Sequence, residues 1–499
     1  MNDAMLTKGL LTFAGLVCVC RLTAGTPPQP MLAAGNESNW DAYAKALARG
    51  VRAGTSARQA PDWLKTGYIY QIQPRAFTHE GPIKAATRKL PLVKDAGATV
   101  VYLMPVNVLD DETEHLDPVA RQFKQPKGFY RTKDYFNTDP EFGTNEDRRE
   151  FVREAHRLGM KVIFDIVFFH CGHSAELIRK NPNWVERNPD GSIRIGKWSY
   201  PVLNFREAGL REYLYTVLTY LVADVDVDGF RCDVAETQPL DFWVEARRRV
   251  SAIKPDAVLI CEGFGCPGEQ EYAFDACYDW PSKNAIRKSL DGQKPVSDIV
   301  RAWHEKHDNC EKGSRFLRFV ENHDETDMSQ KGKGPRGDSD ERWGRELMEA
   351  ALFYCFTADG IPFLFNGNEF ADRTPQRMLI WTPIDWYGRE TPDGVRRLSF
   401  VRKFAALRKA DPALLSLEPA GGDEPLPLRR HAGPVFGRRG RTLVAGGGRR
   451  RVADERAAPL GDACGHATAL VHLAEAPAVR PRQFVLRQRH ARELSRRLP

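Results

Sequence analysis

Short apolar runs alternate with amphipathic stretches along most of this chain, and this alternation limits its fold more than any other feature. The stretches between the runs, such as 146–158 and 207–222, carry apolar residues at helical spacing and charges on the other face. Strands that alternate with helices are typical of a parallel sheet covered by helices. We therefore predict an α/β protein, a (β/α)8 TIM barrel, in which seven strands can be placed and the eighth cannot. The seven runs are 67–72, 98–106, 161–170, 227–234, 257–264, 316–324 and 361–369.

The chain has 499 residues, which leaves room for further pieces beside a barrel of roughly 250 residues. We expect a lead-in at 25–60 and a catalytic barrel at 61–415. The connection 171–204 is rich in Pro and Gly and follows the third predicted strand. Long connections at that end of a barrel are usually functional. We therefore predict a short lid inserted there.

The two ends of the chain differ from this body. Residues 1–24 place Lys8 before an apolar run at 10–20, which is typical of a secretory signal peptide. We expect a secreted or periplasmic protein, or a cytoplasmic one if this leader is not a signal. Residues 416–499 are rich in Arg, Ala, Gly and Pro and contain no Lys, Ile, Asn, Tyr, Trp or Met. We hypothesise that this poorly defined C-terminal region is translated out of frame, and a basic, disordered extension is the alternative.

The charge is concentrated in that tail. The net charge is +7, and 16 Arg against eight acidic residues lie after Leu415, so the remainder is nearly neutral. A neutral body gives no electrostatic footprint for nucleic acid, and we predict no nucleic-acid partner. No run of about 20 apolar residues is present, so we predict no stable membrane span.

The ten cysteines show no zinc-binding pattern of the CxxC or Cys/His type. Cys232 and Cys261 lie within predicted strands, where we expect buried free thiols. Cys266, Cys277 and Cys310 could pair if the protein is exported, in a connectivity that the sequence does not determine.

Polar residues interrupt the predicted strands at their carboxyl ends. An isolated charge on a buried strand is costly, so each must be paired or functional. A barrel gathers these ends around one centre, so we predict a single site there. The residues are Asp165, His170, Arg231, Asp233, Glu262, His323 and Asp324.

Four segments resemble the signature regions of the α-amylase superfamily of glycoside hydrolases (family 13 type), in their order and spacing. They read DIVFFH from Asp165, GFRCDVAE from Gly229, ICEGF from Ile260 and FVENHDE from Phe319. The flanking segments IYQIQPRAF, YRTKDYFNTDPEFGT, PVLNF and GIPFLFNGNE are also similar to that family. The resemblance covers residues 63–411 and implies a (β/α)8 barrel that cleaves α-glucosidic bonds. Such enzymes usually end in a β-sandwich, which the tail does not resemble.

The resemblance also implies roles for the three carboxylates. Asp233 would be the nucleophile and Glu262 the acid/base, as in retaining glycosidases, whose two carboxyl groups lie about 5–5.5 Å apart. Asp324 resembles the third carboxylate, which binds sugar hydroxyls and helps to stabilise the transition state. Glu262 must keep its proton near neutral pH, which requires a raised pKa.

The neighbouring residues would bind the sugar or hold the carboxylates. His170 and His323 resemble the hydroxyl-binding histidines of the family, and Tyr130 resembles its stacking platform for the sugar ring. Arg231 lies two residues before the nucleophile and is expected to bind substrate and to hold Asp233 ionised. We assign Asp165 a structural role, paired with Arg231.

The sequence departs from the typical α-amylase at two places. Phe169 stands where many α-amylases have the Asn that ligates calcium, and a phenyl ring offers no oxygen to a hard cation. Glu236 and Thr237 stand where Lys and His are common. We therefore expect no required cofactor and no metal ligand at the site, we doubt the usual calcium site, and we expect altered glucan recognition beyond the cleavage point.

Three functions remain open. The leading hypothesis is a hydrolase of α-1,4-linked malto-oligosaccharides or starch. A sucrose- or maltose-converting transglycosylase would use the same residues. A non-catalytic, amylase-like binding subunit would usually have lost the carboxylates that are present here. The sequence predicts no oligomeric state.

Overall fold

The computed structural model describes residues 56–111, 128–263, 268–308, 310–326, 342–376, 378, 381–411 and 414. The predicted signal peptide, most of the lead-in, Cys266 and the tail at 416–499 lie outside these residues.

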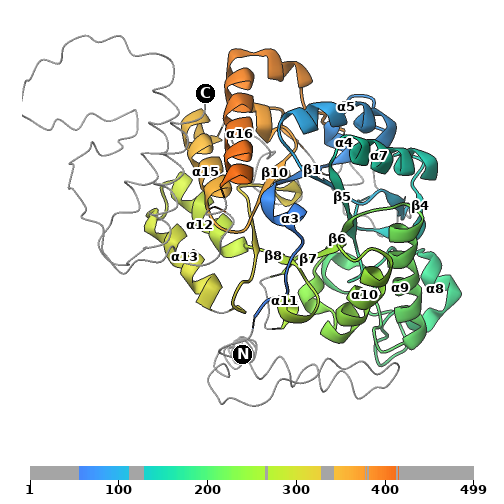
Figure 1. The fold of residues 1–499 in the computed structure, drawn as a ribbon. Coiled ribbons are helices and arrows are strands. Elements are labelled where there is room, and N and C mark those ends of the chain that lie inside the picture. The colour runs from blue at the N-terminus through green and yellow to red at the C-terminus, as the bar shows by residue number, and fades with distance from the viewer. Residues whose placement is uncertain are drawn as a thin grey trace, which may run out of the picture.

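Eight parallel strands close into one barrel (Figure 1). Each strand pairs with its two neighbours in the order β1-β10-β9-β8-β7-β6-β5-β2. The closed parallel barrel confirms the predicted TIM-barrel fold class. The strands are β1 (Ile69–Ile72), β2 (Val100–Leu103), β5 (Lys161–Ile166), β6 (Gly229–Cys232), β7 (Val258–Cys261), β8 (Ala276–Tyr278), β9 (Phe316–Arg318) and β10 (Ile361–Phe365).

The eighth strand is β8, which the sequence did not reveal. It is three residues long and stands between two buried aspartates, Asp275 and Asp279, so no apolar run marks it. Asp275 accepts hydrogen bonds from the Leu259 amide and the Arg247 guanidinium. Asp279 caps the next helix by accepting from the Ser282 amide at 3.0 Å. These carboxylates replace the apolar flanks of an ordinary buried strand.

Helices surround the barrel between successive strands (Figure 1). Local sequence fixes where several of them begin. Thr144 and Asp147 form a reciprocal capping box before one helix, and Thr391 caps another whose first residue is Pro392. The helices are α3 (Asp62–Thr66), α4 (Pro74–Phe77), α5 (Ile83–Asp95), α7 (Asn145–Arg157), α8 (Glu176–Lys180), α9 (Ala208–Ala223), α10 (Leu240–Ile253), α11 (Glu269–Tyr272), α12 (Trp280–Leu290), α13 (Ser297–Asp308), α15 (Arg345–Thr357) and α16 (Pro392–Ala410).

Two excursions leave the barrel at the carboxyl ends of its strands. The first follows β2 and includes the antiparallel pair β3 (Asn107–Leu109) and β4 (Thr132–Thr138), which we did not predict. The second follows β5 at the place predicted for the lid. It contains α8 and isolated antiparallel bridges, among them His170 with Val202 and Val185 with Leu203. The lid is thus a small folded unit that returns to the end of β5.

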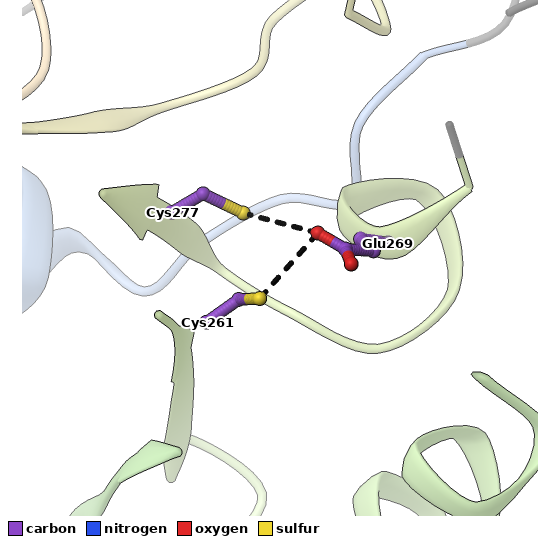
Figure 2. Close-up of side chains that lie close together, drawn as sticks. All are labelled: Cys261, Glu269 and Cys277. Atoms are coloured by element: carbon purple, nitrogen blue, oxygen red, sulfur yellow. Dashed lines mark hydrogen bonds between the residues drawn. The ribbon is translucent and has the colours of Figure 1, made fainter. Parts of the chain in front are cut away.

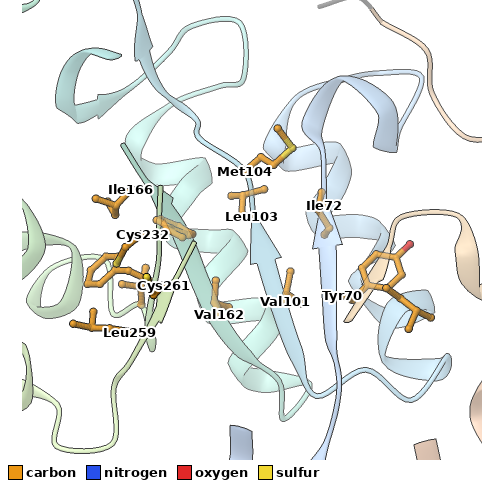
Figure 3. Packing of buried hydrophobic residues seen from close by; sticks show 14 of the residues in the cluster. Tyr70, Ile72, Val101, Leu103, Met104, Val162, Ile166, Cys232, Leu259 and Cys261 are labelled. Carbon is orange, nitrogen blue, oxygen red and sulfur yellow. The ribbon is translucent and has the colours of Figure 1, made fainter. Parts of the chain in front are cut away.

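The strands separate two cores. One fills the barrel with inward residues such as Ile163, Ile260 and Phe363. The other lies between the strands and the helices (Figure 3) and includes Val162 and Leu259. Side chains alternate between the faces of a strand. The outward residues at the ends of β6 and β7 are therefore followed by inward ones.

Two of the cysteine predictions concern the outer core. Cys232 and Cys261 are buried free thiols, as predicted. Cys277 is also a free thiol. Cys266 lies outside the described residues, so the pairing of Cys266, Cys277 and Cys310 stays a prediction. In the described part of the chain, no helix has the length and apolar character needed to cross a membrane.

Asp228 ties the amino end of β6 to its surroundings. Its carboxylate is buried and accepts from the Val162 amide at 2.9 Å, Lys161 at 2.9 Å and Lys254 at 3.3 Å, and it contacts His156 at 2.6 Å. Burial alone would raise the pKa of Asp228. The bonds from His156, Lys161 and the Val162 amide outweigh it and lower the pKa to about 2.

We predict that Asp228→Asn lowers the free energy of unfolding by about 2–3 kcal/mol at pH 7. The folded pKa lies below the unfolded value of 3.8, so this stability is present above about pH 4 and is lost as the pH falls toward 2. Urea unfolding of both proteins between pH 7 and 2 measures the difference. The control is Asp256→Asn, because Asp256 is an exposed partner of Lys161. This change should alter the free energy of unfolding little. A difference that stays constant down to pH 2 would contradict the assignment.

Candidate active site

At the carboxyl ends of β5, β6 and β7, charged side chains lie inside the barrel. Asp165 on β5 is in register with Arg231 on β6. Asp233 directly follows β6, and its amide donates to the Ile166 carbonyl at 2.9 Å. Glu262 directly follows β7, and its amide donates to the Cys232 carbonyl at 3.0 Å. The sheet ladder therefore holds the backbone of both predicted catalytic carboxylates.

The Arg231 guanidinium bridges three of these carboxylates. Its Nη1 donates to Asp165 Oδ1 and to Asp233 Oδ1, both at 2.8 Å. Its Nη2 lies 2.8 Å from Glu262 Oε2. Arg231 is 1% exposed, so water screens these contacts little. One planar cation thus contacts both Asp233 and Glu262.

The protonation of the two carboxyl groups is coupled. Burial raises the pKa of Asp233 well above its ordinary value and also raises that of Glu262, while Arg231 lowers both. We expected Arg231 to hold Asp233 ionised. That expectation was incomplete, because one guanidinium serves three carboxylates and burial outweighs it at Asp233. Both carboxyl groups therefore hold a proton more readily than an exposed carboxyl group does.

The backbone conformation at Val234 adds a constraint on the site that the sequence pattern did not predict. Its φ of 46° is left-handed, which is rare for a β-branched residue. Its amide donates to Glu262 Oε2 at 2.8 Å. Gln238 donates to the carbonyls of Asp233 at 3.0 Å and of Val234 at 3.2 Å. The strained turn after Asp233 therefore aims one amide at Glu262, and such strain is concentrated at functional sites.

A chain of hydrogen bonds connects His323 to Asp165. Gln71 Oε1 accepts from the His323 amide, so Gln71 Nε2 is the donor to His323 Nδ1 at 2.8 Å. The ring proton then lies on Nε2, which faces the Tyr130 hydroxyl. Tyr130 donates in turn to Asp165 Oδ2 at 2.9 Å. Tyr102 donates to the same oxygen at 2.5 Å, so Asp165 is held from three sides.

Burial lowers the pKa of His323, which keeps its ring neutral. The same ring stacks on Tyr130 with 5.4 Å between centroids. Tyr130 thus lies beside the predicted carboxylates and the predicted histidine.

His170 lies on the lid side of the site. Burial lowers its pKa to about 3, and its buried Nδ1 has no hydrogen-bonding partner within the described chain. Trp198 and Tyr200 of the lid approach its ring, with centroids 5.9 and 4.6 Å away. A neutral histidine with an unused ring nitrogen could bond to a hydroxyl group.

The site opens toward Asp324. The side chain of Asp324 is 42% exposed, against 16% for Glu262 and 8% for Asp233. Asn322 orients Asp324 by donating to its Oδ2 at 3.1 Å and accepting from its amide at 3.1 Å. A ligand entering from solvent would meet Asp324 first.

All eight predicted site residues therefore lie around the carboxyl end of the barrel. Sequence reasoning did not single out Gln71, Tyr102, Trp198 or Val234. The first two lie in strand-like runs, where a polar or aromatic residue that faces inward could have been noticed. The conformations of Trp198 and Val234 leave no mark in the sequence.

Comparison with known proteins agrees with this geometry. A family model described as the alpha amylase catalytic domain matches residues 42–192. A cyclomaltodextrinase of Thermoanaerobacter pseudethanolicus is 24% identical over 71% of this chain and 66% of its own. The alpha-amylase MalA of Haloarcula japonica is 30% identical over 72% of this chain and 52% of its own. The chain thus spans about two thirds of the first relative and about half of the second.

A solved structure shows the same fold. The noncanonic maltogenic alpha-amylase of Thermotoga neapolitana is 27% identical, with a TM-score of 0.61 over 71% of this chain and 79% of that one.

We predict that Arg231→Gln lowers the free energy of unfolding by about 3–5 kcal/mol at pH 7, because three buried carboxylates lose their counter-charge. The loss should shrink at pH 5, because without Arg231 the pKa values of Asp233 and Glu262 rise further and these groups take up protons. Urea unfolding at the two pH values measures both effects. Arg153→Gln, which removes an exposed ion pair with Glu146, is the control with little expected loss. An equal loss at both pH values would argue against this charge arrangement.

Proposed function

We propose that the chain belongs to the α-amylase superfamily of glycoside hydrolases and that it is a retaining enzyme that cleaves α-1,4-glucosidic bonds in malto-oligosaccharides or starch. One observation carries this proposal: the guanidinium of Arg231 holds Asp233 and Glu262 side by side at the carboxyl end of the barrel.

The first step breaks the glucosidic bond. Asp233 attacks the anomeric carbon through the oxygen that does not bind Arg231, and a β-linked glycosyl-enzyme forms. Glu262 gives its proton to the leaving oxygen, so the departing sugar leaves as an alcohol. This division needs Asp233 ionised for the attack and Glu262 protonated for the departure, and burial favours the protonated form of Glu262.

The second step releases the sugar. Glu262, now ionised, takes a proton from water, and the water oxygen attacks from the face opposite Asp233. The carbon–Asp233 bond breaks and the product regains the α configuration. We propose that Asp324, His170 and His323 bind sugar hydroxyls and that Tyr130 stacks on the ring. His323 would exchange its contact with the Tyr130 hydroxyl for one with the sugar.

Azide distinguishes the roles of the two carboxylates. With an α-maltosyl fluoride, whose leaving group needs no acid, Glu262→Ala should still form the glycosyl-enzyme. Azide should then enter in place of the activated water and yield the α-glycosyl azide. Asp233→Ala should lose turnover by many orders of magnitude, and azide should restore it as the β-glycosyl azide by direct displacement. Product configuration by NMR measures both outcomes.

The matched control is Glu245→Gln, a carboxylate on α10 that pairs with Arg248 and Arg249 outside the site. It should keep its activity without azide. A β-azide from Glu262→Ala, or an α-azide from Asp233→Ala, would require the two roles to be exchanged.

A transglycosylase is the alternative within the same chemistry, because another sugar could replace water in the second step. Product analysis on maltotriose, maltoheptaose, pullulan and sucrose separates the two. Release of reducing sugar supports hydrolysis, whereas longer or rearranged products support transfer. A non-catalytic binding subunit is disfavoured by the presence of all three carboxylates, and it would bind maltoheptaose with no product.

We also propose that the enzyme needs no calcium at the usual site. Phe169 occupies the position of the expected ligand, and its ring packs edge-on against Trp198 with centroids 6.0 Å apart. Millimolar calcium added to calcium-free protein should leave both Tm and kcat unchanged, because a ligand that does not bind cannot stabilise the fold. A rise in Tm that saturates with calcium would show that another calcium site exists.

Trp198 is proposed to stack on a sugar beyond the cleaved bond. It is 48% exposed although it is a large aromatic residue, and its φ of 64° is left-handed. A stacking contact is worth about 0.5–1.5 kcal/mol, so Trp198→Gly should raise KM for maltoheptaose roughly 2–10-fold. The same change should raise stability by about 1 kcal/mol, because glycine relieves the left-handed backbone.

Trp198→Phe keeps an aromatic ring and the left-handed backbone at this position. Its KM for maltoheptaose and its stability should therefore change less than those of Trp198→Gly. Kinetics and urea unfolding of the two variants give the comparison. An unchanged KM in Trp198→Gly would remove Trp198 from the binding site.

The location of the protein is a separate proposal. We propose that residues 1–24 direct export, and cell fractionation tests it. Protein outside the cytoplasm that lacks these residues supports export, whereas full-length protein inside contradicts it. The free thiols of Cys232 and Cys277 favour the alternative, a reducing cytoplasm.

A further inference from the structure

Three metal-ligating side chains meet on the outer face of the barrel, away from the site described above (Figure 2). Cys261 ends β7, Cys277 lies in β8, and Glu269 begins α11. The two cysteines are partners in the register of the adjacent strands, so their thiols point the same way. Both cysteines are fully buried and Glu269 is 4% exposed.

The distances within this cluster match those of a tetrahedral metal site. Glu269 Oε2 lies 3.4 Å from Cys261 Sγ and 3.7 Å from Cys277 Sγ, and the three ligand atoms lie within 4.8 Å of one another. With Zn–S near 2.3 Å and Zn–O near 2.0 Å, a tetrahedral ion places its sulfur and oxygen ligands about 3.5 Å apart. The side chains therefore surround a zinc-sized position without rearrangement.

A buried cation beside the cluster is a second, independent observation. Lys306 is 6% exposed, and its Nζ has no hydrogen-bonding partner within the described residues. This ammonium lies 4.9 Å from the Phe316 ring centroid. The charge of Lys306 is close enough to act electrostatically on Cys277. An unpaired buried ammonium is costly, and a neighbouring group with net negative charge would offset that cost.

We propose that Cys261, Glu269 and Cys277 bind one structural zinc ion. On binding, the two thiols release their protons to solvent, and two thiolates and one carboxylate surround Zn²⁺ with a net charge of −1, which Lys306 balances. Soft thiolate ligands select zinc over magnesium or calcium. Water completes the four ligands.

The position of the proposed ion implies a structural role. Cys261 and Glu262 are adjacent, so the ion lies on the outer face of β7 directly behind the proposed acid/base. It links α11 to the ends of β7 and β8, which already pair in the sheet. Zinc bound there would hold the backbone that positions Glu262, without touching the substrate.

The sequence pattern does not predict this site. The three ligands are spaced eight residues apart, and one is a carboxylate, so no CxxC or Cys/His motif appears. Only the pairing of β7 with β8 brings the thiols together.

Metal analysis of the full-length protein, purified without chelator, is the first test. We expect one zinc ion per chain by elemental and native mass spectrometry. Protein emptied of metal by unfolding in chelator, then refolded with Co²⁺, should show the near-ultraviolet absorption of thiolate-to-cobalt charge transfer. Neither readout depends on catalysis, and Asp233→Asn should keep its zinc even if the proposed function is wrong.

Variants locate the ligands. Cys261→Ser and Cys277→Ser should lose zinc and the cobalt band, whereas Cys355→Ser, a buried free thiol on α15, should keep both. If the ligand variants do not fold, Lys306→Met provides the test, because loss of a group that supports a metal site weakens affinity about 10–100-fold. Refolded protein that takes up neither zinc nor cobalt, or that binds cobalt without the thiolate band, would overturn the proposal.

Discussion

The bridge between Arg231 and three carboxylates is the interaction on which the rest of the site depends. Burying one cation with one anion costs hydration free energy, and the attraction between the two charges often only offsets that cost. Here a single guanidinium faces Asp165, Asp233 and Glu262, so the cluster has an excess of negative charge that protonation can relieve. The hydroxyls of Tyr102 and Tyr130 fix Asp165, which leaves the other two carboxyl groups for chemistry.

The barrel supports this cluster because its strands have two faces. Residues that face inward at the strand ends carry the charges, and the next residue outward packs against helices. Cys232 precedes Asp233 and Cys261 precedes Glu262 in this way. The same alternation places the proposed zinc ligands behind the acid/base.

Much of this arrangement could be predicted from the sequence. Seven strands were visible as apolar runs, and charges at their ends indicated one site, because a barrel gathers such ends. The eighth strand was missed because Asp275 and Asp279 flank it where apolar residues were expected. The left-handed turn at Val234 and the exposed ring of Trp198 depend on tertiary contacts. The balance of charge around Arg231 also required the geometry, since the sequence indicated Asp165 and Asp233 as partners and the fold adds Glu262.

The central claim is that Asp233, held by Arg231, forms a covalent bond to the sugar. Trapping that bond tests it most directly. The protein is incubated with a fluorinated maltosyl fluoride that forms the glycosyl-enzyme faster than it is released, and mass spectrometry then maps the label. The account predicts one added glycosyl group per chain, on Asp233. A label on Glu262 or Asp324, or turnover without any covalent species, would contradict it.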